Sequence, residues 1–156
     1  MANTTDSEMP PLPEISIYNH QEVVPLGREL LELFQSAAEL ALPMVIEVAA
    51  EAGSALVHLE EVEVSIVDDE TIADVHLRFM DIPGATDVIT FDHGEIHISV
   101  ETAISQAREY DNAYERELML YIIHGLLHLA GHEDASEHGL ATMNRHQQEI
   151  LEKVWR

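Results

Sequence analysis

Cysteine is absent from this 156-residue sequence. Its absence excludes disulfide bonds and thiolate metal ligands, so any metal ion must be held by nitrogen and oxygen atoms. A chain without cysteine suits the reducing cytoplasm, where disulfide bonds are rare. We therefore expect a cytoplasmic protein with no disulfide-linked partner.

Basic residues are scarce as well. Lys153 is the only lysine and six arginines are scattered along the chain, whereas 30 acidic residues bring the formal net charge to -23. A surface of this charge repels a polyanion, and no basic run marks a nucleic-acid-binding stretch. The composition thus argues against broad, nonspecific binding to nucleic acid.

Long apolar runs are missing too. No stretch of eighteen or more apolar residues occurs, and the N-terminus shows neither a basic leader nor an apolar segment behind it. We therefore expect no membrane contact. With 46% hydrophobic residues, the chain is long enough to bury one core and too short to promise two domains.

The first thirteen residues are polar and contain three prolines. We expect them to be a disordered lead-in, followed by one domain over residues 14–156. Hydrophobic periodicity predicts strands in that domain near residues 15–17, 57–67, 88–91 and 96–99, the last two forming a hairpin. It predicts helices near residues 26–52, 70–79, 100–110, 113–130 and 137–156.

Turn and capping residues refine this prediction. Pro43 should end or kink the first helix, because proline lacks the amide hydrogen that a helix interior needs. Asp68 or Asp69, Ser99, Asp111 or Asn112, and Ser136 are the expected N-caps of the later helices. The pattern predicts an α+β fold, with a small mixed sheet of about four strands packed with helices, and a metal site on a late helix and the turn after it.

The expected metal site begins with a histidine pair. His124 and His128 stand four residues apart in a predicted helix, so their side chains project from nearly one face. Two imidazoles at that spacing can bind one zinc ion. They lie in the apolar run 118–130, where unpartnered imidazoles would be costly. The apolar surroundings therefore add to the evidence from spacing that this pair binds a metal ion.

A third ligand is expected shortly after the pair. Gly131 can end the helix in the left-handed conformation and turn the chain back towards the metal. Asp134 stands where the pattern H-x3-H-x2-G-x2-[HD] supplies its last ligand, and His132 is the alternative. Two imidazoles, one carboxylate and an open fourth position are typical of catalytic zinc. The opposite interpretation is that Asp134 and Ser136 only cap a helix.

Two segments resemble a known family. The stretch His124-Gly-Leu-Leu-His-Leu-Ala-Gly131 resembles the signature H-G-x-L-H-L-x-G-Y-D-H of the YbeY-type endoribonucleases, the bacterial rRNA maturation factors. Residues 83–91, Pro-Gly-Ala-Thr-Asp-Val-Ile-Thr-Phe, resemble the family's P-T-D-V-L-S-F with a short insertion, and Gly94-Glu-Ile96 resembles its G-D-I. The order and spacing agree over about residues 14–150.

The resemblance implies that His124 and His128 are the first two ligands of one Zn²⁺ per chain. Counting from His128 puts Asp134 at the third position, where the family usually has histidine. Met80 stands in place of the family's arginine before the second segment. Arg78, two residues earlier, is therefore our candidate for binding substrate phosphate. No general base is identifiable, and the catalytic residues stay unassigned.

The resemblance also implies a function. We expect a zinc-dependent single-strand endoribonuclease that acts in maturation of the 3′ end of small-subunit rRNA and in ribosome quality control. Its expected partners are ribosomal RNA, the small ribosomal subunit and basic ribosomal proteins.

Two alternatives remain open. The first is a noncatalytic ribosome-assembly factor whose zinc only adds stability, which the acidic composition favours. The second is a zinc metallopeptidase with an H-E-x-x-H helix. Gly125 opposes it, because it stands where such enzymes carry the glutamate that acts as general base.

Overall fold

The structure is a computed structural model, and it describes residues 11–50 and 54–155. The expected lead-in falls mostly on residues 1–10, outside the described residues. Four strands form one mixed sheet in the order β1-β2-β4-β3. They are β1 (Glu14–Asn19), β2 (Glu61–Val67), β3 (Val88–Thr90) and β4 (Glu95–Ser99). The first, second and fourth are parallel and β3 runs antiparallel at one edge, which confirms the predicted α+β fold with a mixed sheet.

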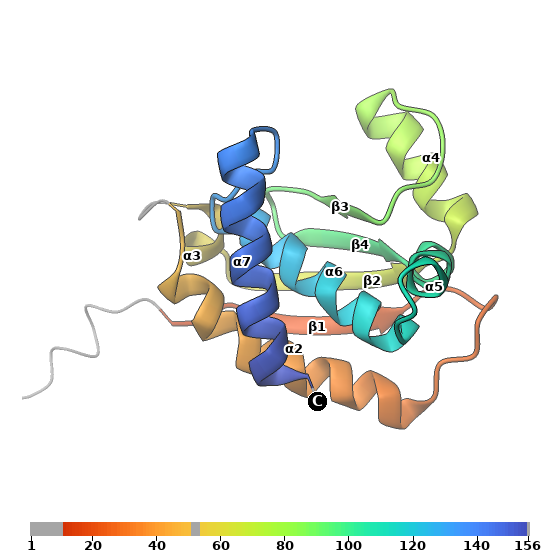
Figure 1. Cartoon of the computed structure of the whole chain (residues 1–156), viewed down its shortest axis with the longest axis horizontal. Helices are drawn as coiled ribbons and strands as arrows, with labels where there is room; N and C mark the ends of the chain where they lie inside the picture. The colour runs from red at the N-terminus through yellow and green to blue at the C-terminus, as the bar shows by residue number, and fades with distance from the viewer. Residues whose placement is uncertain (1–10, 51–53, 156) are drawn as a thin grey trace, which may run out of the picture.

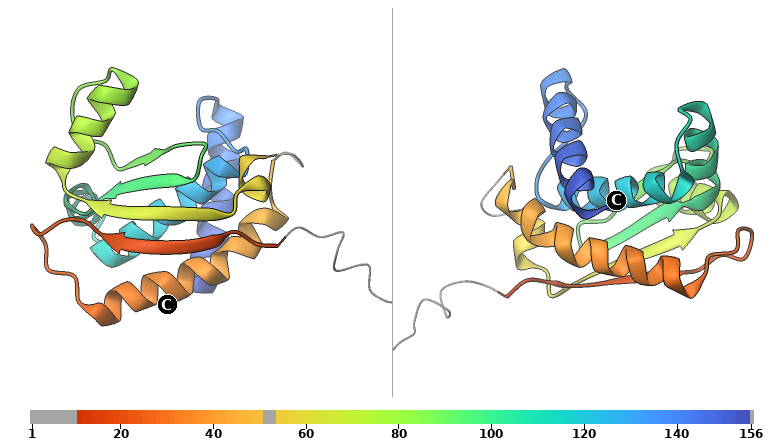
Figure 2. Two further views of the ribbon diagram at one scale, coloured as in Figure 1. Left: turned by 180° about the vertical axis from the view of Figure 1, so that it is seen from behind. Right: turned by 60° about the horizontal axis from the view of Figure 1, so that its bottom comes forward.

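Three long helices lie on one side of this sheet, the first two against its face and the third packed across them (Figures 1 and 2). They are α2 (Arg28–Glu47), α6 (Tyr114–Leu129) and α7 (Glu137–Val154). Their apolar sides and the sheet share one core, in which Phe34, Ile122 and Leu151 are fully buried. None of the helices in the described ranges has the length and apolar character needed to cross a bilayer. Helix α6 contacts both β3 and β4, so its histidines lie beside the β3 edge of the sheet.

The remaining helices are shorter. They are α3 (Ala55–His58), α4 (Asp69–Met80) and α5 (Val100–Glu109). Helix α4 stands on the β3 side of the sheet (Figure 1) and closes a second, small core around Val67, Ile72 and Ile89. Because Ile89 alternates with Val88 and Thr90 along β3, this small core lies on the sheet face opposite α6.

Several local predictions are confirmed. The side chains of Asp68, Ser99 and Ser136 each accept a hydrogen bond from a backbone N–H in the first turn of α4, α5 and α7 respectively. The predicted hairpin is the β3–β4 pair, closed by a hydrogen bond from the Gly94 amide to the Phe91 carbonyl. These features depend on residues close together in the sequence.

Of the two outcomes predicted for Pro43, an end or a kink of the helix, the structure excludes the end. The helix continues through this proline to Glu47. Pro43 has no amide hydrogen to donate to the Glu39 carbonyl four residues earlier. Both residues are exposed, so water can bind that carbonyl instead. Ala41, Leu42 and Val45 are buried on the opposite side, and their packing holds the helix together.

Two further boundaries differ from the prediction. Residues 55–58 form the single turn α3, with Leu56 fully buried, and β2 begins only at Glu61. Neither Asp111 nor Asn112 caps α6. Its N-cap is Ala113, without a side-chain hydrogen bond, and Asp111 has a positive φ of 55° that turns the chain after α5. Short polar residues suit both a cap and a left-handed turn, so the sequence did not separate these roles.

The outer edge of β1 is occupied by a side chain from α2. The Gln35 amide nitrogen donates to the Ile15 carbonyl oxygen at 2.6 Å, and the Ile17 amide donates to the Gln35 side-chain oxygen at 3.1 Å. Gln35 thus satisfies two neighbouring backbone groups that an edge strand would otherwise leave unpaired.

Helix α6 approaches the sheet most closely at Gly125. A Cβ atom built there would lie 2.8 Å from Ile96 Cγ2 and 2.9 Å from its Cδ1. Ile96 is fully buried in β4 and has no room to move aside. This glycine therefore sets how near α6, with its two histidines, can come to the strands.

We expect Gly125→Ala to destabilise the protein by about 1–2 kcal/mol. Overpacking costs about 1–3 kcal/mol, and contacts under 3 Å to a fully buried side chain place this site in the upper part of that range. Alanine regains about 1 kcal/mol of helix propensity over glycine. Urea denaturation would measure the difference. Gly27→Ala is the control for crowding: no atom lies within 4 Å of a Cβ at Gly27, so its cost is only that of alanine at the N-cap of α2. If Gly125→Ala were as stable as the wild type, the close approach would be wrong.

Candidate metal centre

Three potential metal ligands meet at the C-terminal end of α6. The Nε2 atoms of His124 and His128 are 3.1 Å apart. Asp134 Oδ2 lies 3.6 Å from Nε2 of His124 and 3.8 Å from Nε2 of His128. All three ligand atoms lie within 4.8 Å of one another. The structure therefore gathers the three residues that the sequence singled out into one group that can hold a metal ion.

The turn after α6 brings Asp134 to the histidines. Gly131 has a φ of 94°, in the left-handed region, as predicted. The His132 amide then donates to the Leu127 carbonyl, which reverses the chain at the end of the helix. Ser136 starts α7 two residues after Asp134. The turn that carries Asp134 is thus held between two helices, although Asp134 itself is outside both.

The spacing of the donor atoms fits a tetrahedral ion. Two nitrogens bound to zinc at about 2.0–2.1 Å in tetrahedral geometry lie about 3.3 Å apart. The observed separation of 3.1 Å between the two Nε2 atoms is close to that value. The side chains are 23%, 30% and 43% exposed for His124, His128 and Asp134, so one side of the group faces solvent. A fourth position open to a water or a substrate is what separates catalytic from structural zinc sites.

Gln147 fixes the orientation of His124. This glutamine comes from α7, is 6% exposed, and its side-chain oxygen accepts a hydrogen bond from His124 Nδ1. Its amide nitrogen donates to Asn144 Oδ1 at 3.3 Å, which fits that assignment of oxygen and nitrogen. A proton on Nδ1 leaves the lone pair on Nε2, the atom that faces His128 and Asp134. No local sequence pattern indicates this contact, because it depends on how α6 and α7 cross.

His128 is suited to metal binding by its lowered pKa. Burial lowers the pKa of His128 below its usual 6.5, and the nearby His124 lowers this pKa further. The imidazole of His128 is therefore neutral near pH 7. A neutral ring can offer a lone pair to a metal ion, whereas a protonated ring cannot.

His132, the alternative third ligand, is engaged elsewhere. Its Nε2 donates to the Val48 carbonyl at 2.7 Å, and its ring lies 5.2 Å from that of His146. The side chain is only 9% exposed. The structure thus brings Asp134, and not His132, to the histidine pair. His132 instead joins the turn after α6 to the end of α2.

A hollow of about 290 Å³ adjoins the metal group. It is lined by Met80, Val88, Ile89, Thr90, Asp92 and His128. Arg78, the predicted phosphate-binding residue, does not line it. Its guanidinium pairs with Asp74 at 3.0 Å on the exposed side of α4. Met80, at the family's arginine position, brings an apolar side chain to the hollow.

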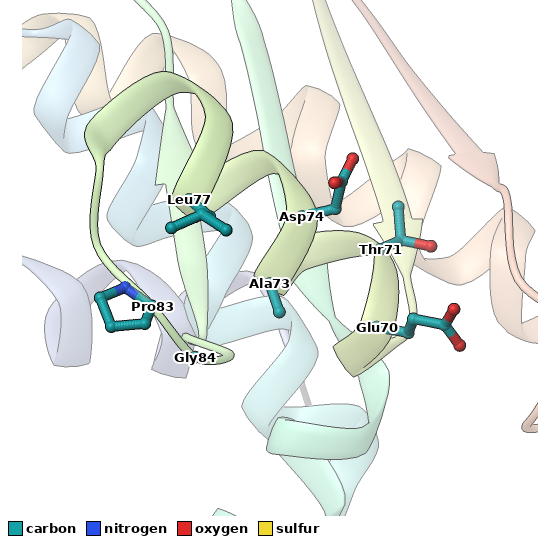
Figure 3. A pocket seen from close by; sticks show the side chains of 7 residues that line it. All are labelled: Glu70, Thr71, Ala73, Asp74, Leu77, Pro83 and Gly84. Atoms are coloured by element: carbon teal, nitrogen blue, oxygen red, sulfur yellow. The ribbon is translucent and has the colours of Figure 1, made fainter.

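A larger hollow of about 540 Å³ lies on α4 (Figure 3). Its lining residues are Glu70, Thr71, Ala73, Asp74, Leu77, Pro83 and Gly84, and none of them lines the hollow beside His128. It contains no histidine, and its two carboxylates are not part of the three-residue ligand group. Of these two hollows, only the smaller one adjoins the potential metal ligands.

The packing of Gly125 bears on the peptidase alternative. The glutamate of an H-E-x-x-H helix has to reach water bound at the metal. Position 125 faces the Ile96 side chain in β4, where even a Cβ atom has no room. In this fold, the residue after the first histidine is directed at the core. A general base from that position is thus opposed by geometry as well as by the missing carboxylate.

Comparison with known proteins gives consistent matches. The family model described as Endoribonuclease YbeY matches residues 16–155. The Endoribonuclease YbeY of Symbiobacterium thermophilum is 35% identical over 155 residues, which cover 88% of this chain and 95% of that relative. The Endoribonuclease YbeY of Moorella thermoacetica is 33% identical over 160 residues, covering 90% and 97%. The solution structure of TM1509 from Thermotoga maritima has a TM-score of 0.57 at 27% identity and covers 90% of this chain and 89% of that one.

Proposed function

Because this chain belongs to the YbeY family of endoribonucleases, we propose that it is a zinc-dependent enzyme that cuts single-stranded RNA. We propose further that it acts in the cytoplasm, in maturation of the 3′ end of small-subunit rRNA and in ribosome quality control. Its partners would be ribosomal RNA, the small subunit and basic ribosomal proteins. The observation that carries the proposal is the convergence of His124, His128 and Asp134 at one solvent-facing site.

The proposed chemistry divides between the ion and the chain. A bound zinc ion supplies a Lewis acid that polarises a phosphodiester oxygen and lowers the pKa of water to about 7. His124 and His128 would hold it through their Nε2 atoms, the first oriented by Gln147. Asp134 adds a negative charge where the family usually has a neutral ligand, which makes the ion a somewhat weaker acid. The adjoining hollow leaves room for substrate beside His128.

Arg78 remains our candidate for a phosphate contact. Its present ion pair with Asp74 is exposed, with side chains 68% and 59% accessible. An exposed i,i+4 pair of this kind is worth only about 0.3–0.5 kcal/mol. Breaking it therefore costs little, and a phosphate near the end of α4 offers the guanidinium a stronger, charge-assisted partner.

The test is cleavage of a precursor of the small-subunit rRNA 3′ end. Zinc-loaded wild type should cut the single-stranded precursor, a chelator should stop the reaction, and added zinc should restore it. His128→Ala, purified in the same way, controls for contaminating nuclease. Equal cleavage by both preparations, or none by the wild type, would count against the nuclease.

A noncatalytic assembly factor is the second candidate, favoured by the net charge of -23. An acidic protein can dock on basic ribosomal proteins and reach rRNA indirectly. Co-sedimentation with small subunits separates the two candidates. If His128→Ala sediments as well as wild type, and neither preparation cuts RNA, binding without chemistry is the better account.

A further inference from the structure

The end of α4 and the loop after it expose several large apolar side chains together. Leu77, Phe79, Met80 and Ile82 are 52%, 63%, 46% and 48% exposed. We call these four residues the α4 patch. Apolar side chains exposed as a group, rather than singly, mark interaction surfaces. Because Met80 also lines the hollow that contains His128, the α4 patch is continuous with the metal centre.

Phe79 is the outer member of an aromatic cluster. Its ring lies 5.5 Å from that of Phe91, edge to face at 80°. On the hairpin, Phe91 stacks on His93 at 5.5 Å with an angle of 20° between the rings. Phe79 is 63% exposed and the His93 side chain 64%. Planar groups therefore lie at the surface next to the metal centre, supported from beneath by the half-buried Phe91.

Charge limits what this surface can bind. Arg78 is the only arginine or lysine of α4, and it is paired with Asp74. Asp81 and Asp92 are exposed beside the cluster, in a chain with a net charge of -23. A nucleic-acid backbone can therefore gain attraction on α4 from Arg78 alone. Bases, by contrast, stack on aromatic rings through their π faces, an interaction that needs no neutralised phosphate.

We propose that Phe79, with Phe91 and His93, is a stacking platform for an unpaired base of single-stranded RNA. The strand would continue past Met80 into the hollow beside His128. The inference rests on the proposed function and adds to it what is recognised, namely an unpaired base next to the position of the cut. Bases within a duplex are covered by their neighbours and cannot use the platform, so it selects single strands.

The test measures binding by the full-length, zinc-loaded protein. The probes are fluorescent single-stranded octamers of 2′-O-methyl adenosine or uridine, checked on a gel for integrity, and their binding is followed by anisotropy. We expect tighter binding of the adenine octamer, because larger bases offer a larger stacking face. Phe79→Ala should weaken its binding roughly tenfold. Phe79→Trp, which keeps a planar ring, should restore it.

Tyr110→Ala is the matched control. Tyr110 is an exposed aromatic residue, 67% accessible, at the end of α5 and outside the α4 patch. Its loss should leave binding unchanged. Equal affinities of Phe79→Ala and Tyr110→Ala would overturn the platform. So would equal competition by a duplex, or a Phe79→Ala variant that keeps RNA binding but no longer binds a purified basic ribosomal protein, which would mark a protein-docking surface.

Cleavage kinetics separate this inference from the proposed function. If wild type cuts RNA, and the Phe79→Ala variant has a KM about tenfold higher with little change in kcat, the nuclease activity and the stacking platform are both supported. Cleavage with an unchanged KM in Phe79→Ala would keep the nuclease and remove the platform. Phe79-dependent binding by a wild type that cuts no RNA would keep the platform and remove the nuclease.

Discussion

His128→Ala is expected to lose its stoichiometric metal and to cut RNA more than about a hundredfold more slowly than wild type. A residue that merely supports a ligand contributes about 10–100-fold to metal affinity or activity, and His128 offers a ligand atom directly. His124→Ala and Asp134→Ala should behave alike, because each removes one of three converging donors. Mass spectrometry of metal in the purified proteins would give the metal-to-chain ratio.

Two histidine variants are the controls for this experiment. His138→Ala removes an exposed histidine from the first turn of α7 and should keep one metal per chain. His132→Ala should also keep the metal, since its Nε2 is bound to the Val48 carbonyl. Loss of metal in His132→Ala but not in Asp134→Ala would reassign the third ligand. No stoichiometric metal in any form would favour the noncatalytic assembly factor.

Gln147→Leu is expected to weaken zinc binding by about 10–100-fold without unfolding the protein. Leucine has a similar size, but it cannot accept the hydrogen bond from His124 Nδ1, so the proton and the ring are no longer fixed. Competition with a coloured chelator would measure the affinity. Gln147→Glu keeps an acceptor oxygen and should retain most of the binding.

Gln148→Leu is a control of the same substitution one position away. Gln148 is exposed on α7, whereas Gln147 is buried against α6. The neighbouring change should therefore leave zinc affinity at the wild-type value. If the two leucine variants bind zinc equally, Gln147 does not orient the ligand.

Sequence reasoning succeeded where the cause is local. The caps at Asp68, Ser99 and Ser136 each join a side chain to an amide three residues later. The spacing of His124 and His128 follows from the helix period, and Gly131 was recognised from the conformation that glycine permits. Such features need only a few consecutive residues, so they can be predicted before the fold is known.

The same reasoning could not supply features whose cause is tertiary. Pro43 stays inside α2 because buried residues on the other side of the helix outweigh one lost hydrogen bond. Gln147 and Val48 reach His124 and His132 from helices far along the chain. No local pattern reports those contacts. Arg78 was chosen by position, and the structure turns it towards Asp74, while Met80 faces the hollow.

The two hydrogen bonds from Gln35 to β1 have a consequence for self-association. A sheet can grow from molecule to molecule when an outer strand offers free backbone groups to its copy, which is how many proteins begin to aggregate. The Ile15 carbonyl and the Ile17 amide are already bonded to a side chain of the same molecule. Proteins often guard such edges with lysine, but β1 contains none. The glutamine blocks growth of the sheet at this edge without a positive charge.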